Sequence, residues 1–293
     1  MKPMKIMRAE YLGMCFGVRD AITLAMEQAG SGPLTILGEL VHNETVLNEL
    51  RLRGIQLVSR PEEVQTQAVL ITAHGTSNGV IRQAQARGLN VSEATCPLVH
   101  VAHRALRELV RQGYYPVVIG VRQHVEVRGM TGDLETFDVV LSEADVAAMQ
   151  EHSRIGIVAQ TTQPQERVRE LVEQIRRRFP LSDVRFVDTV CQPTKQRQNA
   201  AVKLAHEADV VVVIGGANSN NTRELVQTCR RWCERVYHVQ SAADLRSEWF
   251  DEAQTVGVTA GTSTPDALIQ GVEEWLRCEA VAREREPKNL QAA

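Results

Sequence analysis

Three cysteines stand at equivalent places in a threefold internal repeat, and this repeat constrains the fold more than any other feature of the sequence. Each cysteine opens a segment in which apolar side chains recur at the spacing of an amphipathic helix. The three segments begin at Cys15, Cys96 and Cys191. A strand-like apolar run follows each of them, at 34–40, 115–121 and 209–216. The repeat therefore predicts three similar units, each containing a helix that begins at a cysteine.

Each unit also contains a second apolar run, and a strand-like stretch leads into each cysteine. The second runs are VLITAHGTS (69–77), IGIVAQTTQ (155–163) and TVGVTAGTS (255–263), and the leading stretches are KIMRAEYL, LNVSEA and VRFVDT. Strands that alternate with helices in this way are typical of parallel sheets flanked by helices. We therefore expect an α/β protein of three modules, at residues 1–96, 97–190 and 191–293. The last module carries a C-terminal helix and a charged ending, 282–293, that we expect to be frayed.

Polar residues follow the apolar runs at matching offsets from the cysteines. His42 lies 27 residues after Cys15 (42 minus 15), and Ser219 lies 28 after Cys191 (219 minus 191). Ligands of parallel sheets bind beyond the carboxyl ends of the strands, so modules that face one axis would share one central site. The residues expected there are Cys15, Cys96, Cys191, His42, His74, His124, Glu126, Thr161, Ser219, Asn221 and Ser263.

The three repeated cysteines are candidates for metal ligation. A helix N-terminus lowers a thiol pKa, which suits both ligation and nucleophilic attack, but a nucleophile does not need three copies. Three thiolates fit either an iron-sulfur cluster with one open iron or a zinc ion with one further ligand. The spacings of 81 (96 minus 15) and 95 residues (191 minus 96), and the absence of any Cys-x-x-Cys, disfavour structural zinc. Cys229, Cys233 and Cys278 are expected to pack in the interior.

Composition excludes several classes of partner. The formal net charge of −3 disfavours a nucleic-acid surface. No stretch approaches the roughly 18 apolar residues of a membrane span, and the start lacks the apolar core of a signal peptide. We expect a cytoplasmic protein with small-molecule partners, no nucleic acid and no membrane association. In a reducing cytosol its cysteines are not expected to form a disulfide frame.

Nine motifs, in order, resemble those of the LytB or IspH family of 4-hydroxy-3-methylbut-2-enyl diphosphate reductases. They are GMCFGV, VHNETV, AHGTS, ATCPLV, HVEVRG, AQTT, TVCQPTKQRQ, GGANSNNT and GVTAGTSTP. The resemblance spans about residues 8–270. It implies a trefoil of three pseudo-equivalent α/β modules around a central iron-sulfur site. It also implies reductive removal of the substrate hydroxyl to give isopentenyl and dimethylallyl diphosphates, the last step of the non-mevalonate (MEP) isoprenoid pathway.

The resemblance also implies roles for individual residues. Cys15, Cys96 and Cys191 would hold a 4Fe-4S cluster with one open iron, or a 3Fe-4S cluster after oxidative damage. Glu126 would donate a proton, with Thr161 beside it and His124 near the substrate hydroxyl and phosphate. The residues implied for the allylic diphosphate are His42, His74, His124, Thr161, Ser219, Asn220, Asn221 and Ser263. Reduced ferredoxin or flavodoxin would supply electrons.

Three residues depart from the usual family pattern: Phe16 after the first cysteine, Val125 within His-Pro-Glu, and Asn220 within Ser-Ser-Asn. They bear on rate, substrate preference and cluster exposure. Two alternatives remain. A non-catalytic iron-sulfur sensor of the same fold would have no evident use for Glu126. A zinc hydrolase would need a water-activating base beside its metal, and no such motif appears.

Overall fold

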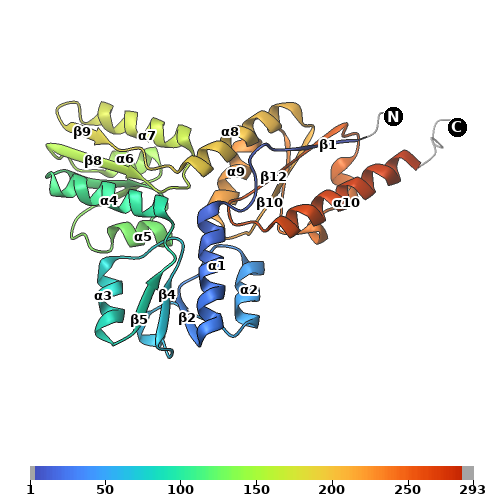
Figure 1. Cartoon of the computed structure of the whole chain (residues 1–293). Helices are drawn as coiled ribbons and strands as arrows, with labels where there is room; N and C mark the ends of the chain where they lie inside the picture. The colour runs from blue at the N-terminus through green and yellow to red at the C-terminus, as the bar shows by residue number, and fades with distance from the viewer. Residues whose placement is uncertain (1–3, 286–293) are drawn as a thin grey trace. The chain divides into compact units, whose positions relative to one another are not determined.

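The computed structural model describes residues 4–285, and these contain three sheets, each of four parallel strands (Figure 1). The inner strands are near-continuous apolar runs, as expected where helices cover both faces of a parallel sheet. Val210–Ile214, for example, is buried along its whole length. The predicted α/β class, with three modules of parallel strands, is confirmed.

The first sheet has the strand order β3-β2-β4-β5. Its strands are β2 (Leu34–Leu37), β3 (Gln56–Val58), β4 (Ala68–Ile71) and β5 (Asn90–Glu93). The segments around it are α1 (Phe16–Ser31), α2 (Glu44–Leu52), the 3-10 turn η1 (Pro61–Glu63) and α3 (Asn78–Ala86). Asn43 and Ser77 cap α2 and α3 by accepting hydrogen bonds from backbone N–H groups, which fixes where the chain leaves the strand ends.

The second sheet repeats this order as β7-β6-β8-β9. Its strands are β6 (Tyr115–Ile119), β7 (Asp138–Val140), β8 (Arg154–Ala159) and β9 (Asp183–Phe186). Its helices are α4 (Pro97–Arg111), α5 (Val125–Thr131), α6 (Glu143–Ala148) and α7 (Gln165–Arg178).

The third sheet has the equivalent order β11-β10-β12-β1. Its strands are β10 (Val210–Ile214), β11 (Arg235–Val239), β12 (Thr255–Ala260) and β1 (Lys5–Arg8). Its remaining elements are α8 (Gln192–Glu207), α9 (Asn220–Arg230), η2 (Ala242–Asp244), η3 (Ser247–Phe250) and α10 (Asp266–Arg285). None of the helices within residues 4–285 combines the length and apolar character that a membrane span requires.

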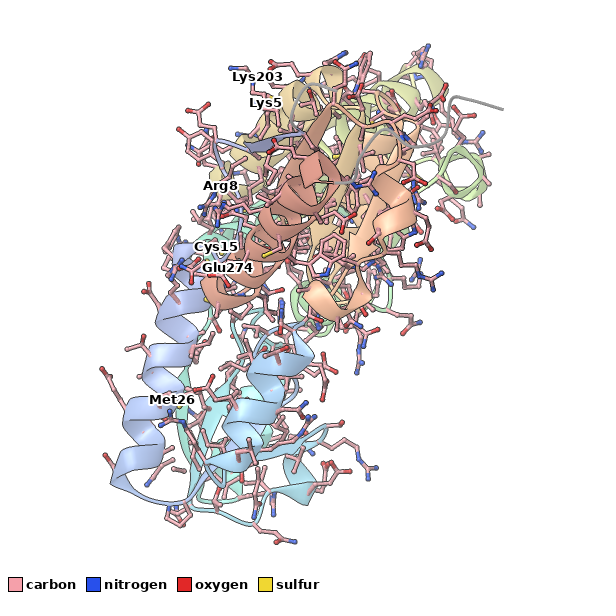
Figure 2. The ribbon with its side chains drawn as sticks, turned by 90° about the vertical axis from the view of Figure 1, so that its right-hand side faces the viewer. Lys5, Arg8, Cys15, Met26, Lys203 and Glu274 are labelled. Carbon is pink, nitrogen blue, oxygen red and sulfur yellow. The ribbon has the colours of Figure 1, made fainter. Side chains whose placement is uncertain are left out.

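Strand β1 joins the third sheet although it begins the chain. Lys5 pairs with Thr255 and Arg8 with Val258, and Figure 2 labels Lys5, Arg8 and the downstream Cys15. The sequence predicts that β1 belongs to the module at 1–96. That prediction is wrong for the pairing of this strand, because its partner is β12 of the third sheet. A parallel strand has no local partner in sequence, which is why its pattern alone cannot assign its sheet. The three module boundaries otherwise stay a prediction.

The chain forms two compact units. Among the described residues, one unit comprises 4–15 and 196–285 and holds the third sheet; the other comprises 16–195 and holds the first and second sheets.

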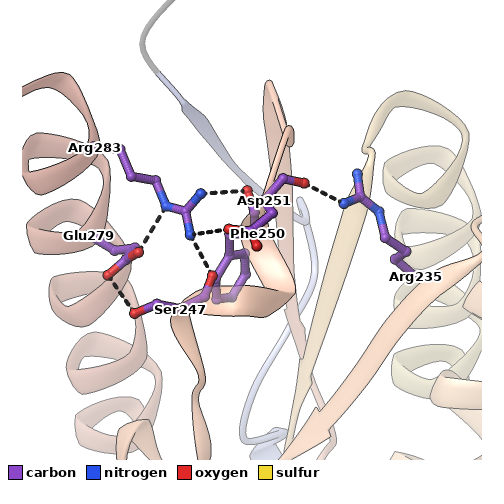
Figure 3. A network of polar contacts seen from close by, with 6 residues as sticks. All are labelled: Arg235, Ser247, Phe250, Asp251, Glu279 and Arg283. Atoms are coloured by element: carbon purple, nitrogen blue, oxygen red, sulfur yellow. Dashed lines mark hydrogen bonds and ion pairs between the residues drawn. The ribbon is translucent and has the colours of Figure 1, made fainter. Parts of the chain in front are cut away.

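The end of α10 is anchored by an arginine (Figure 3). Arg283 donates to Glu279 (2.8 Å) and Asp251 (3.0 Å), and Ser247 donates to Glu279 (3.0 Å). The expectation of a frayed ending is therefore wrong for residues 282–285, which continue the helix. Residues 286–293 lie outside the described residues.

Candidate active site

Three histidines from three strand ends meet within the unit of residues 16–195. His42 follows β2, His74 follows β4, and His124 follows β6 as the N-cap of α5. The rings of His42 and His74 stack with centroids 4.3 Å apart, and His124 meets them at 5.1 and 5.5 Å. One ring nitrogen from each lies within 4.8 Å of those of the other two. The structure thus brings these predicted site residues together.

Within this cluster, His74 favours the neutral imidazole. Burial lowers the pKa of His74 well below its ordinary value of 6.5, and His42 and His124 lower it further. The Nδ1 atom of His74 is buried and has no hydrogen-bond partner among the residues that the structure describes. Since buried polar groups are normally hydrogen-bonded, this nitrogen indicates a place for a ligand. The cluster can donate hydrogen bonds to an anion that brings its own negative charge.

Glu126 is a buried acid one residue into α5. Its carboxylate accepts hydrogen bonds from the Thr161 N–H (2.6 Å) and the Thr161 hydroxyl (2.9 Å), and its own N–H donates to His124 Nδ1 (3.1 Å). Burial raises the pKa of Glu126 to about 7, although the Thr161 hydrogen bonds act in the opposite direction. A carboxyl with this pKa can hold a proton near neutral pH and release it, as a general acid must.

Gln160 positions this pair, and the sequence analysis missed it. Its Oε1 accepts from the Val121 N–H (3.0 Å), which fixes the loop after β6 to the loop after β8. A Cβ on Gly120 would lie only 2.8 Å from the Gln160 Cβ, so glycine is required for this approach. Gln160 stands inside the AQTT motif, and that signal could have identified it.

Two of the three repeated cysteines belong to the same unit. Cys96 is the N-cap of α4, and an added Cβ on Gly17 would lie 2.4 Å from its Sγ. Cys191 precedes α8 and donates its N–H to the Thr161 carbonyl (3.0 Å). Its Sγ lies 3.1 Å from the Thr194 hydroxyl. Both thiols are partly exposed, unlike a cysteine that only fills a core.

The third repeated cysteine, Cys15, belongs to the other unit. Its N–H donates to the Thr262 carbonyl (3.0 Å) in the loop after β12. Two residues earlier, the Gly13 carbonyl accepts from the buried Arg197 guanidinium through Nε (3.0 Å) and Nη2 (2.7 Å). Arg197 was not predicted as a site residue, although it lies in the TVCQPTKQRQ motif. These bonds hold the backbone that leads into Cys15.

The same unit contains a buried polar group around the start of α9. Ser219 caps the helix by accepting from the Thr222 N–H (3.3 Å), and Asn221 Oδ1 accepts from the Thr262 N–H (2.9 Å). The Asn221 Nδ2 atom has no hydrogen-bond partner in the described part of the chain. Asn220 and Ser263 are also buried. A helix N-terminus with such side chains is suited to an anion.

The other cysteines differ from one another. Cys229 and Cys233 are buried in the core of the third module, and burial raises the pKa of Cys229 to about 12. Cys278 is exposed, so the prediction that it packs in the interior was wrong. It stands two residues after the buried Leu276, which places it on a different face of α10. Phe16 is 46% exposed at the start of α1.

Sequence comparisons identify relatives along nearly the whole chain. The family model for the LytB protein matches residues 6–277. A 4-hydroxy-3-methylbut-2-enyl diphosphate reductase of Aquifex aeolicus is 37% identical over 278 residues, covering 93% of this chain and 96% of the relative. A protein of the same name from Geobacter sp. (strain M21) is 39% identical over 272 residues, covering 92% and 95%.

Two solved structures share the fold. The diphosphate reductase of Plasmodium falciparum has a TM-score of 0.87 at 24% identity, covering 94% of this chain and 88% of that one. A structure titled as (E)-4-hydroxy-3-methyl-but-2-enyl diphosphate reductase, the terminal enzyme of the non-mevalonate pathway, has a TM-score of 0.67 at 37% identity. It covers 94% of this chain and 99% of that one. These likenesses agree with the fold predicted from the repeat.

Proposed function

The chain belongs to the LytB protein family, and from this premise we propose that it reduces 4-hydroxy-3-methylbut-2-enyl diphosphate to isopentenyl and dimethylallyl diphosphates. This reaction replaces a C–O bond by a C–H bond, consumes two electrons and two protons, and releases water. The observation that carries the proposal is Glu126, a buried acid whose pKa is raised to about 7 beside three histidines.

In this proposal the diphosphate binds at the histidine cluster, and His74 takes up a proton as the anion binds. His42, His74 and His124 supply imidazole nitrogens, and the Nδ1 of His74, which has no partner among the described residues, donates to a phosphate oxygen once the ring is protonated. We assign the same ligand to the start of α9, through Ser219, Asn220 and Asn221, and to Ser263. A helix start favours an anion because its first backbone N–H groups have no partner within the helix.

Glu126 delivers the proton that converts the departing hydroxyl into water. Its protonated form is populated near neutral pH because the carboxyl is buried, and Thr161 holds it in one orientation through two hydrogen bonds. His124 is fixed to the same turn because its Nδ1 accepts from the Glu126 N–H. His124, which contacts phosphate in this proposal, and Glu126, which gives the proton, therefore share the start of one short helix.

The residues fit the iron-sulfur cluster that the family implies. Cys15, Cys96 and Cys191 are the three cysteines next to helix starts, and all three are partly exposed. At Cys96 the sulfur lies directly against Gly17, where a side chain would collide with it. When bound, the cluster supplies the electrons and a Lewis-acidic iron. We propose the 4Fe-4S form with one open iron, with reduced ferredoxin or flavodoxin as the donor in the cytoplasm.

Anaerobic turnover tests this proposal against a non-catalytic sensor of the same fold. Anaerobically purified protein should be coloured and should form both products from 4-hydroxy-3-methylbut-2-enyl diphosphate with a chemical reductant. A coloured protein that binds the substrate without converting it would support the sensor instead. A colourless protein that contains zinc would contradict both.

A further inference from the structure

Resting on the proposed function, we propose that His103 is a positioning residue that fixes the His74 loop and the start of α5, and with them the phosphate-binding histidine and the proton donor. His103 lies in α4 and is only 7% exposed. It belongs to none of the groups assigned above to substrate or cluster. We infer its role from the residues that lie next to its ring.

The His103 ring fills a space left by two glycines. An added Cβ on Gly75 would lie 3.6 Å from His103 Nε2, and one on Gly129 would lie 3.4 Å from His103 Cε1. Gly75 directly follows His74, and Gly129 stands one turn of α5 after Glu126. The ring therefore lies beside the backbone of both elements close to their functional residues, where a side chain at either glycine would meet it.

The two elements are also fixed to each other. A Cβ on Gly129 would approach the Thr76 Cα to 3.2 Å, so the loop and the helix backbone are in close contact. Asp133, just beyond α5, accepts from the Asn78 N–H (2.7 Å) and the Gly79 N–H (2.8 Å) at the start of α3. We call this contact between the His74 loop and α5 the joint. His103, on α4, packs against the joint.

Cys96, the N-cap of the same helix, stands seven residues before His103. Seven residues are two turns of a helix, so the two positions lie on nearly the same face. His103 thus connects three elements that carry proposed site residues: the α4 start, the His74 loop and α5. Errors of about 1 Å in such elements can cost on the order of 100-fold in rate.

The chemistry of His103 suits packing and not proton transfer. Burial lowers its pKa to about 4, so the ring is neutral near pH 7. Its Nε2 is buried without a hydrogen-bond partner among the described residues. A cavity of about 130 Å³, lined in part by Thr76, Thr95, His100 and Arg107, adjoins it. Loss of the ring would enlarge that space and leave the joint unsupported.

Hydrogen–deuterium exchange of the intact protein without substrate tests the joint independently of catalysis. In His103→Ala, amides of residues 75–80 and 125–132 should exchange at least about 10-fold faster than in wild type. Leu109→Ala is the matched control, because Leu109 is buried two turns further along α4 and packs near Gly156. It should lose stability without faster exchange in those two segments. The proposal would be overturned if the two variants showed equal exchange in these segments. It would also be overturned if exchange in His103→Ala were no faster than in wild type.

Kinetics give the second readout. His103→Ala should raise KM, and its kcat should fall by about 10- to 100-fold. His103→Phe should bring KM and kcat most of the way back to the wild-type values, because its ring refills the space. Loss in both variants with unchanged exchange would overturn the packing role. If wild type itself does not turn over while exchange responds as expected, the proposed function fails and the joint stands. Should His103→Ala not fold, Gly129→Ala tests the joint from the other side and should give the same exchange pattern.

Discussion

Thr161 donates two hydrogen bonds to the Glu126 carboxylate, one from its backbone N–H (2.6 Å) and one from its hydroxyl (2.9 Å). Both bonds favour the ionised acid and oppose the effect of burial on its pKa. Together, burial and the two hydrogen bonds give Glu126 a pKa of about 7. Near neutral pH, a small change in either effect therefore changes the fraction of Glu126 that carries a proton.

Thr161→Val removes the hydroxyl bond and keeps the backbone bond. The pKa of Glu126 should rise above about 7, and the decline of kcat at alkaline pH should move upward by roughly 1 pH unit. The pH dependence of kcat measures this. Thr131→Val is the control, because the Thr131 hydroxyl donates within α5 to the Val127 carbonyl (2.9 Å). An equal displacement in the control would contradict the assignment.

Glu126 should also make the stability of the fold depend on pH. Its pKa is higher in the folded chain, about 7, than the ordinary 4.5, so the folded state binds the proton more tightly. The resulting stability is complete below about pH 4.5 and is lost as pH rises through 7. Relative to Glu126→Gln, the wild-type free energy of unfolding should fall by roughly 3 kcal/mol between these limits. Denaturant unfolding at several pH values checks this, and a parallel pH dependence in both proteins would exclude it.

His74 should gain protons when the anion binds. Its pKa lies well below 6.5 in the site without anion, and a bound phosphate should raise it. Pyrophosphate affinity should therefore fall as pH rises, with proton uptake visible by calorimetry in buffers of different ionisation enthalpy. His74→Ala should bind at least about tenfold more weakly and take up fewer protons. His152→Ala, whose ring instead stacks on Tyr115, should behave as wild type. Unchanged affinity in His74→Ala would return this histidine to a structural role.

The cluster assignment separates the cysteines into two groups. Cys15→Ser, Cys96→Ser and Cys191→Ser should each sharply reduce the iron and sulfide content. Cys229→Ser and Cys278→Ser should not. Burial makes the Cys229 thiolate unfavourable, and Cys278 is exposed on α10. Iron analysis after anaerobic purification decides this. A requirement for Cys229 equal to that for Cys96 would refute the assignment.

The sequence predicted the sheets because apolar runs and helical spacing are local signals. It also predicted that His42 and His74 follow strand ends, and parallel pairing of β2 with β4 then brings those ends together. The pairing of β1 with β12 escaped prediction because it joins residues about 250 apart (255 minus 5) through a contact with no local signature.

Other features could not be predicted because they depend on packing. The raised pKa of Glu126 comes from burial, which the motif around it does not encode. In the sequence, His103 resembles any residue on the inner face of a helix. Its proximity to two glycines depends on the tertiary structure. Cys278 is predicted to be in the interior because an isolated cysteine is usually buried, but it lies on an exposed face of α10.

Turnover by Glu126→Gln, with the cluster content measured in the same sample, tests the central claim most directly. Glutamine keeps the size of the side chain but has no transferable carboxyl proton, so it separates binding from proton delivery. The variant should retain its iron and bind the substrate, while kcat falls by at least about 100-fold, the usual contribution of a general acid. Near-normal turnover with a full cluster would mean that Glu126 does not supply the proton.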